Sequence, residues 1–556
     1  MEKLWLKNYP KDVPYHVNVE QYRSIGDFFE EICQQFRDKT AYSHEGVTLS
    51  YQRLHQLSTQ FAVFLQHQGL QKGDRIALMM PNLLQYPVAL YAALRLGLVV
   101  VNINPLFKPD ELLYELKDAK PKAIVIFSHF AHTLEKILAD CPELLIITTD
   151  FADIFPPVKR VVSMVVIKYI LRLVPTYQFK QSYSFRHVLA YGKNKEFKHI
   201  TVTLTDLAFL QYTGGTTGIA KAAMLTHGNI LANVIQVGAW FQPAVTIGEE
   251  ILIAALPMYH IFSLMVNGLL FLKFGAEMVL ITNPRDISTL IKRMAKSHFT
   301  GMIGVNLLFK ALLSHQEFKK VNFSRLHLAI AGGAALTQAV ADEWLSVTGK
   351  PLLEGYGLTE ASPVVTVDPL AGYQFQGSIG LPMPSTDIKI IHDNGVACEV
   401  NQPGELCVRG PQVMSGYWGR ADETNKVLMA DGWLKTGDVA VMDERGYLRI
   451  IDRKKELINV SGFKVFPSEV EAVIATMPQV FEVAVIGVND TAQGESVVAV
   501  IVKKQAELDE VMVKDFCHQH LTGYKVPKSV KFVEELPKTN VGKVSRKAVR
   551  EKYLNS

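Results

Sequence analysis

The sequence predicts an α/β fold, with a large domain of several subdomains built on mostly parallel sheets, followed by a small α+β domain. Two observations lead to this prediction. Short apolar runs alternate with helical patterns as far as about residue 440, which is typical of parallel sheets buried on both faces. After Asp438 the sequence becomes charged and rich in turns, and the last stretch of about one hundred residues suits a separate domain.

The apolar runs and helical patterns define the expected elements in order. In the large domain we expect strands at residues 74–80, 123–127, 144–149, 251–257, 278–282, 299–305 and 326–333, with helices at 83–97 and 286–298. In the small domain we expect helices at 469–476 and 511–521, with strands at 482–488, 495–504 and 530–536.

Composition excludes several classes of protein. The chain has 556 residues, of which 48% are hydrophobic and 20% charged, so it has ample core. A formal net charge of +4 is small for this length, and we expect no nucleic acid partner. The five cysteines are scattered and the N-terminus lacks the apolar centre of a signal peptide. We therefore expect a cytoplasmic protein.

The segment QYTGGTTGIAKAAMLTH, residues 211–227, is rich in glycine and threonine and contains a lysine. Glycine lets the backbone approach an anion closely, threonine adds hydroxyl donors and Lys221 adds a positive charge. The spacing differs from the common phosphate loop, where lysine directly follows the last glycine. An apolar run precedes the segment and a helical pattern follows it, so we expect a phosphate site at a strand-to-helix junction. A flexible surface turn is the alternative.

A basic amphipathic helix is expected at residues 159–174, KRVVSMVVIKYILRLV. Lys168 and Arg172 are four residues apart and share one helical face, while Val162, Val166 and Ile170 spread over the other side. Such a helix can lie in a membrane interface, here the inner surface of the cytoplasmic membrane. A core-facing helix with two snorkelling cations is the commoner alternative.

Five segments in a fixed order require one explanation: the TGGTTG loop, EGYGLTE at residues 354–360, KTGD at 435–438, DRKKELINVSGFK at 452–464 and PKTNVGK ending at Lys543. Together they resemble the adenylate-forming (AMP-binding) superfamily, which includes acyl-CoA synthetases, luciferases and peptide-synthetase adenylation domains. Within it, the sequence is most similar to the long-chain acyl-CoA synthetases over nearly its whole length.

The resemblance implies the adenylate-forming fold and an AMP-forming ligase reaction. A long-chain fatty acid attacks the α-phosphate of ATP to give acyl-AMP and diphosphate, and CoA then takes the acyl group and releases AMP. The acyl-CoA would supply β-oxidation and lipid metabolism. ATP, Mg²⁺ and CoA are the implied cofactor and co-substrates. The oligomeric state stays open, with a homodimer as one arrangement.

The resemblance also implies roles for individual residues. Lys543 would act at the α-phosphate, Glu360 with Thr213 would hold magnesium, and His260 would lie beside the carboxylate. Asp438 would accept the ribose hydroxyls with support from Arg453, and Tyr356 would stack on adenine. The remaining residues expected at the nucleotide and CoA sites are Gly214, Gly215, Thr216, Thr217, Gly218, Lys221, Gly333, Glu354, Gly355, Gly357, Thr359, Lys455 and Lys464.

The expected domains follow from these roles. Residues 1–451 would form the AMP-binding domain, 452–455 the hinge, and 456–556 the mobile domain that carries Lys543. The small domain would rotate between the two half-reactions. Three positions depart from the family pattern: Ala222 replaces glycine, Leu264 stands where some relatives place a tryptophan gate, and Asn459 replaces a lysine.

Two related reactions stay open as alternatives. The first is a fatty acyl-AMP ligase that loads a carrier protein, and the second is a medium-chain acyl-CoA synthetase. A nucleotide-responsive fatty-acid binding protein without turnover would require loss of Lys543, Glu360 or Asp438, and all three are present.

Overall fold

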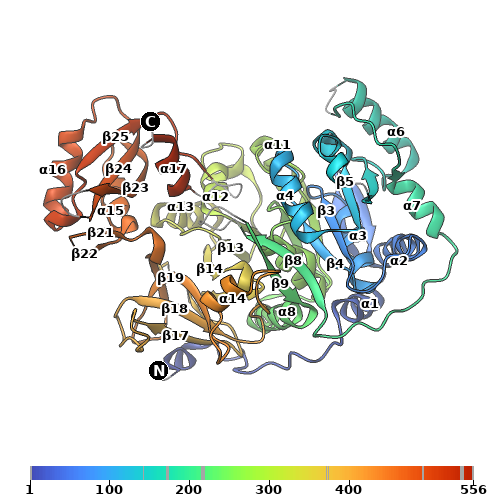
Figure 1. The fold of residues 1–556 in the computed structure, drawn as a ribbon, viewed down its shortest axis with the longest axis horizontal. Helices are drawn as coiled ribbons and strands as arrows, with labels where there is room; N and C mark the ends of the chain where they lie inside the picture. The colour runs from blue at the N-terminus through green and yellow to red at the C-terminus, as the bar shows by residue number, and fades with distance from the viewer. Residues whose placement is uncertain are drawn as a thin grey trace.

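The computed structural model describes residues 3–141, 143–170, 174–213, 220–370, 372–373, 375–461, 463–490, 494–538 and 544–553. Two large sheets and their helices form the main body, and a four-stranded sheet lies beside that body and below the small C-terminal domain (Figure 1). This arrangement is the mixed α/β fold with a large and a small domain that the sequence predicts.

The first large sheet has seven strands in the order β7-β6-β5-β3-β4-β8-β9, and only β9 runs antiparallel to its neighbour. Every residue of β5 is buried, as expected for a strand covered on both faces. The strands are β3 (Arg75–Met79), β4 (Val99–Asn102), β5 (Ala123–Phe127), β6 (Leu145–Thr149), β7 (Tyr183–Ser184), β8 (Leu207–Thr213) and β9 (Lys221–Thr226).

The second large sheet has nine strands in the order β16-β15-β14-β13-β12-β10-β11-β1-β2. Its central strands, from β14 through β1, are parallel, and the strands at its two edges are antiparallel. The strands are β1 (Thr40–His44), β2 (Val47–Ser50), β10 (Ile251–Ala254), β11 (Glu277–Leu280), β12 (Gly301–Gly304), β13 (Leu328–Gly332), β14 (Leu353–Gly357), β15 (Val364–Val367) and β16 (Leu381–Pro382).

Helices fill three layers around these two sheets. One apolar core joins residues of both sheets through α1 (Ile25–Gln35), α2 (Tyr51–His67), α3 (Gln85–Arg95) and α8 (His227–Phe241). A second core packs α11 (Ile287–Ser297), α12 (Asn306–Leu313) and α13 (Gln338–Thr348) on the outer face of the nine-stranded sheet. A third packs α4 (Pro109–Ala119) and α5 (Ala131–Glu135) on the seven-stranded sheet.

The four-stranded antiparallel sheet connects the main body to the small domain. Its strands, in spatial order, are β17 (Asp387–Ile391), β18 (Gly404–Arg409), β19 (Leu434–Met442) and β20 (Leu448–Arg453). The short helix η9 (Lys454–Glu456) follows β20 directly. The predicted hinge at residues 452–455 therefore covers the end of β20 and the start of η9.

The small domain has one sheet with helices packed against it. Its elements are β21 (Ile458–Val460), β22 (Phe463–Val465), α15 (Pro467–Ala475), β23 (Val480–Asp490), β24 (Gly494–Lys503), α16 (Glu510–His520), β25 (Ser529–Val533) and α17 (Arg546–Tyr553). A bridge pairs Lys538 with Val544, so the chain on either side of residues 539–543 is held together.

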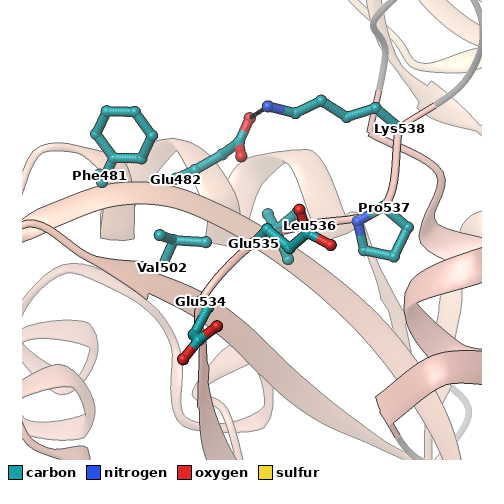
Figure 2. Close-up of a pocket in the computed structure, with 8 residues that line it drawn as sticks. All are labelled: Phe481, Glu482, Val502, Glu534, Glu535, Leu536, Pro537 and Lys538. Atoms are coloured by element: carbon teal, nitrogen blue, oxygen red, sulfur yellow. Dashed lines mark ion pairs between the residues drawn. The ribbon is translucent and has the colours of Figure 1, made fainter.

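This domain contains a cavity of about 310 Å³. Figure 2 shows the residues that line it, 481–482, 502 and 534–538. Lys538 crosses its rim to pair with Glu482 at 3.0 Å. The cavity contains none of the residues that the sequence assigns to substrates, so it adds nothing to the predicted site.

Helix α6 (Pro157–Val165) lies at the end of the main body that is farthest from the small domain (Figure 1). Val158, Val161, Val162 and Val165 share one face by helical spacing, and all four are exposed. Lys159 instead points inward and donates to the backbone carbonyl of Glu45. The apolar face of the helix is therefore turned to solvent, and a core-facing helix, the commoner alternative, is not what the structure has.

Candidate active site

The glycine and threonine loop joins two antiparallel strands. Thr213 ends β8 and pairs in register with Lys221, the first residue of β9. The predictions for Gly214, Gly215, Thr216, Thr217 and Gly218 lie outside the described residues. The expected strand-to-helix junction is wrong, because β9 intervenes and α8 starts only at His227, after its Thr226 cap. The helix N-terminus therefore does not follow the loop directly.

Lys221 has two neighbours from a distant part of the chain. Its ammonium group pairs with Glu423 on α14 (Ala421–Val427) and lies 5.3 Å above the centroid of the Tyr417 ring. Lys221 and Lys426 both donate to Glu423 and lower its pKa to about 2. The ammonium group of Lys221 is therefore already paired with a carboxylate of the protein.

Glu360 lies next to the same strands. It is in the short helix η8 (Thr359–Ala361), which packs against β8, the strand that ends at Thr213, and against β9. The hydroxyl of Tyr417 donates to Oε1 of Glu360 at 2.6 Å, and the backbone carbonyl of Glu360 accepts from Met414 at 2.8 Å. The Glu360 carboxylate therefore has a fixed side-chain partner.

These oxygen donors suit magnesium, which binds through one or two carboxylates together with substrate phosphates. The described residues contain no group of three or more metal-ligating His, Cys, Asp or Glu side chains. Glu360 supplies a carboxylate and Thr213 a hydroxyl, both oxygen donors of the kind that magnesium binds.

A second carboxylate, that of Asp438 on β19, lies next to Tyr356 at the end of β14. The hydroxyl of Tyr356 donates to Oδ2 of Asp438 at 2.6 Å, and Nε of Arg453 lies 3.3 Å from Oδ1. Asp438 and Arg453 are register partners on β19 and β20. Position 357, next to Tyr356, requires glycine, because a Cβ there would lie 2.2 Å from the carbonyl oxygen of Pro363. Tyr356, Asp438 and Arg453 therefore come together as predicted.

Glu354 has a different environment from the rest of its motif. Its side chain is buried and accepts from the backbone amide of Leu336 at 3.0 Å, and its own amide donates to Asp368. Burial raises the pKa of Glu354 to about 8 and that of Asp368 to about 7. The Glu354 side chain thus supports the segment after β13, where Gly333 has a φ of +74°.

His260 is the N-cap of α9 (Ile261–Met265). Its Nδ1 accepts from the backbone amide of Phe262 at 3.4 Å, so the neutral ring carries its proton on Nε2. Burial lowers the pKa of His260 to about 4, which keeps the ring neutral near pH 7. Leu264, at the position of the expected gate, is fully buried in the core. His260 can therefore donate one hydrogen bond from Nε2.

The predicted hinge, residues 452–455, is surrounded by charged groups. Partial burial of the Lys455 ammonium group, and then the charge of Arg453, lowers the pKa of Lys455 to about 8. Lys454 pairs with Asp393 at 3.1 Å and with Glu405 at 2.8 Å, and Lys464 also pairs with Asp393. Lys464 thus contacts the turn that follows β17 in this orientation of the small domain. Lys543 lies outside the described residues.

Comparison with known proteins identifies the family. The sequence model of the AMP-binding enzyme family matches residues 29–418, and that of the AMP-binding enzyme C-terminal domain matches residues 469–543. The chain is an AMP-binding enzyme.

Individual relatives match over nearly the full length. A long-chain-fatty-acid–CoA ligase of Escherichia coli O157:H7 is 50% identical over 99% of this chain and 98% of its own. A ligase of the same name from Yersinia pestis is 50% identical over 100% and 99%. The crystal structure of ATP-bound MatB from Rhodopseudomonas palustris is 29% identical, with a TM-score of 0.80 over 95% of this chain and 99% of that one.

Three residues of this AMP-binding enzyme were not found from the sequence. Tyr417 contacts Glu360, which is 57 positions away in the chain. Glu423 contacts Lys221, which is 202 positions away. Arg546 binds Asp452 at 2.9 Å, together with Glu456 and Glu471. Only Arg546 had a local signal, because it lies three residues after Lys543 in the same basic segment.

Proposed function

We propose that this AMP-binding enzyme is a long-chain-fatty-acid–CoA ligase that converts fatty acid, ATP and CoA to acyl-CoA, AMP and diphosphate. The observation that carries the proposal is the Tyr356, Asp438 and Arg453 group beside η8. It offers an aromatic ring, a carboxylate with two acceptor oxygens and a cation in mutual contact. Two of the relatives described above, each 50% identical over nearly the full length of the chain, are named long-chain-fatty-acid–CoA ligases.

The nucleotide would bind across the strand ends of the main body. Asp438 would accept from the ribose hydroxyls, with Arg453 beside it, and the ring of Tyr356 would cover the adenine, flanked by Gly355 and Gly357. Thr213 and the loop after it would face the phosphates. Glu360, with Thr213, would hold Mg²⁺, which supplies positive charge to the phosphate oxygens when it is bound.

The fatty acid carboxylate would approach from the side of His260. A neutral imidazole can hold a carboxylate oxygen by donating a hydrogen bond from Nε2. Because the ring carries no positive charge, it does not attract the phosphates in place of the carboxylate. Gly333 would leave space between the acyl and adenine regions. Catalysis in this step is mostly the positioning of two anions and the stabilisation of charge at the α-phosphate, which is the role of Lys543.

The second step requires the small domain to rotate about the hinge at 452–455. Lys543 would move away from the α-phosphate. The hairpin of β21 and β22, which carries Lys464, would move to the path by which the CoA thiol enters. In the present orientation Lys464 pairs with Asp393, so the rotation that brings it to CoA would exchange this contact for the phosphates of CoA.

Product analysis tests the proposal. Oleate, ATP and magnesium should release diphosphate and accumulate acyl-AMP, and CoA should then give acyl-CoA with AMP. Formation of ADP would contradict an adenylate intermediate. Transfer to an acyl carrier protein but not to CoA would favour the acyl-AMP ligase instead. A series of acids from acetate to oleate, with kcat/KM for each, separates long-chain from medium-chain preference.

A second proposal concerns where the substrate is found. The exposed apolar stripe of α6 and the exposed Lys168 that follows it fit the surface of an anionic membrane, where long-chain fatty acids partition. None of the described helices combines the length and apolar character that crossing a membrane requires. We therefore propose peripheral contact of a cytoplasmic enzyme with the inner membrane surface through residues 159–174.

Vesicle co-sedimentation tests this contact. Val161→Asp with Val165→Asp should remove binding to phosphatidylglycerol vesicles. Val511→Asp with Met512→Asp, on an exposed face of α16, should leave binding unchanged. Equal binding of both variants would reject the membrane contact. A homodimer remains a prediction that sedimentation velocity can test.

A further inference from the structure

We infer that Tyr417 is a positioning residue, which orients the carboxylate of Glu360 toward the magnesium ion that accompanies ATP. This inference rests on the proposed function, because it assumes that Glu360 is the metal ligand. Tyr417 belongs to no motif that predicted the site, and it reaches Glu360 from the segment between β18 and α14.

The contact with Glu360 is specific. The Tyr417 hydroxyl donates to Oε1 at 2.6 Å, and among the described residues no other side chain donates to this carboxylate. One oxygen is therefore fixed by a charge-assisted hydrogen bond, while the other keeps its lone pairs for a cation. Without that bond the carboxylate, on a three-residue helix, would be free to rotate about its side-chain torsions.

The ring of Tyr417 is itself held in place. It is 7% exposed, its backbone amide donates to Oγ1 of Thr424 at 2.9 Å, and a β-bridge joins it to Ala223 on β9. The ammonium group of Lys221, paired with Glu423, lies 5.3 Å above the ring. Tyr417 thus connects the strand that follows the phosphate loop to the predicted magnesium carboxylate.

A hydrogen bond that orients a metal ligand has a measurable signature. Removing such a partner typically weakens metal affinity by about 10-fold to 100-fold, although the metal never touches the residue that is changed. A purely structural hydrogen bond would change stability and leave metal affinity as it was. The two roles can therefore be separated by measuring metal binding directly.

The test uses Tyr417→Phe in the full-length protein, which keeps the ring and removes the hydroxyl. The probe is Mn²⁺, measured by electron paramagnetic resonance with α,β-methylene-ATP bound. We expect Mn²⁺ affinity to fall about 10-fold, while affinity for the analogue without metal stays within about twofold. In the double variant with Glu360→Gln, the Tyr417→Phe change should cause no further loss.

Tyr212→Phe is the matched control. The Tyr212 hydroxyl donates to Asp118 at 2.7 Å, and Asp118 keeps its partner Arg420 when that hydroxyl is removed. Thermal unfolding of both variants shows that each is folded. Mn²⁺ affinity of Tyr417→Phe within about twofold of the parent, or an equal loss in Tyr212→Phe, would overturn the positioning role. Failure of the parent protein to bind Mn²⁺ with the analogue would instead overturn the metal assignment of Glu360, and this inference with it.

Discussion

The hydroxyl of Tyr356 donates a 2.6 Å hydrogen bond to Asp438, and Arg453 approaches the other oxygen of the same carboxylate at 3.3 Å. Strand register places Asp438 opposite Arg453, while Tyr356 comes from the nine-stranded sheet. The predicted ribose acceptor is therefore held by side chains from two different sheets.

Asp438→Asn should raise the KM for ATP by about 10-fold to 100-fold, because hydrogen bonds to a charged group contribute about 1.5–3 kcal/mol. Initial rates of diphosphate release over a range of ATP concentrations measure the change. Asp387→Asn is the control, since Asp387 also pairs with an arginine, Arg409 at 2.9 Å, and lies in the same four-stranded sheet. An unchanged KM in Asp438→Asn would contradict the ribose role.

Lys543→Ala should abolish formation of acyl-AMP and preserve conversion of supplied acyl-AMP to acyl-CoA. The physical reason is that Lys543 is expected to neutralise charge at the α-phosphate only in the first step. Each half-reaction is measured separately, by diphosphate release and by thioester formation. Equal loss of both would show that the two steps do not use different domain orientations.

Glu354→Gln should change the pH dependence of stability. Burial raises the folded-state pKa of Glu354 to about 8. Between its unfolded value and pH 8 the folded protein holds a proton that the unfolded chain has released, so stability falls as pH rises through this range. Glutamine still accepts a hydrogen bond from the Leu336 amide but does not ionise, so the variant does not lose stability in this way as the pH rises. The Tm of Glu354→Gln relative to the parent should therefore be clearly higher at pH 8.5 than at pH 5.

Glu444→Gln is the control for that experiment, because Glu444 is exposed. Its Tm difference from the parent should be the same at both pH values. The same difference at both values for Glu354→Gln would show that Glu354 is already ionised in the folded protein.

Exchange of the charges of Lys221 and Glu423 should reveal a direct coupling. Lys221→Glu and Glu423→Lys each place like charges together and should destabilise the protein, whereas the double variant restores a pair. We expect a coupling free energy of about 1 kcal/mol from urea unfolding of the four proteins. Strict additivity of the two single changes would mean that the ion pair contributes nothing to the position of α14.

Asp452→Ala should loosen the small domain. The Asp452 side chain is 1% exposed and accepts from Arg546 at 2.9 Å and from the Ser468 amide at 2.7 Å, so it joins the last strand of the large domain to the small one. We expect faster tryptic cleavage after Lys454 and Lys455. Glu535→Ala, which removes only an exposed pair with Lys552, should leave the rate unchanged. An unchanged rate in Asp452→Ala would show that other contacts hold the domain.

Local sequence patterns predicted most of the helices and strands. They failed where contacts between residues distant in the sequence determine the structure. Residues 123–127 were predicted as a strand and form β5 with the same bounds. Strand β9 was missed because its alanines have low strand propensity, and pairing with β8 is what makes it a strand. For α6, helical spacing showed which residues share a face and could not show that this face is exposed.

Sequence motifs named both partners of some contacts in the candidate site and only one partner of others. Asp438 and Arg453 belong to motifs that the sequence shows, and the structure pairs them. Tyr417 and Glu360 are 57 residues apart, and no periodicity or spacing relates them. Only the packing of η8 against β8 and β9 makes them neighbours.

The lowered pKa of Lys455 also gives the hinge a chemical reactivity of its own. An amine with a pKa of about 8 has a substantial neutral fraction near pH 7.5, whereas an ordinary lysine is almost entirely protonated there. The neutral amine is the nucleophilic form, and the pKa of Lys454 is raised instead, so we expect an acylating reagent at low excess to modify Lys455 before Lys454. A fluorophore attached there would test whether the small domain rotates about residues 452–455 during turnover.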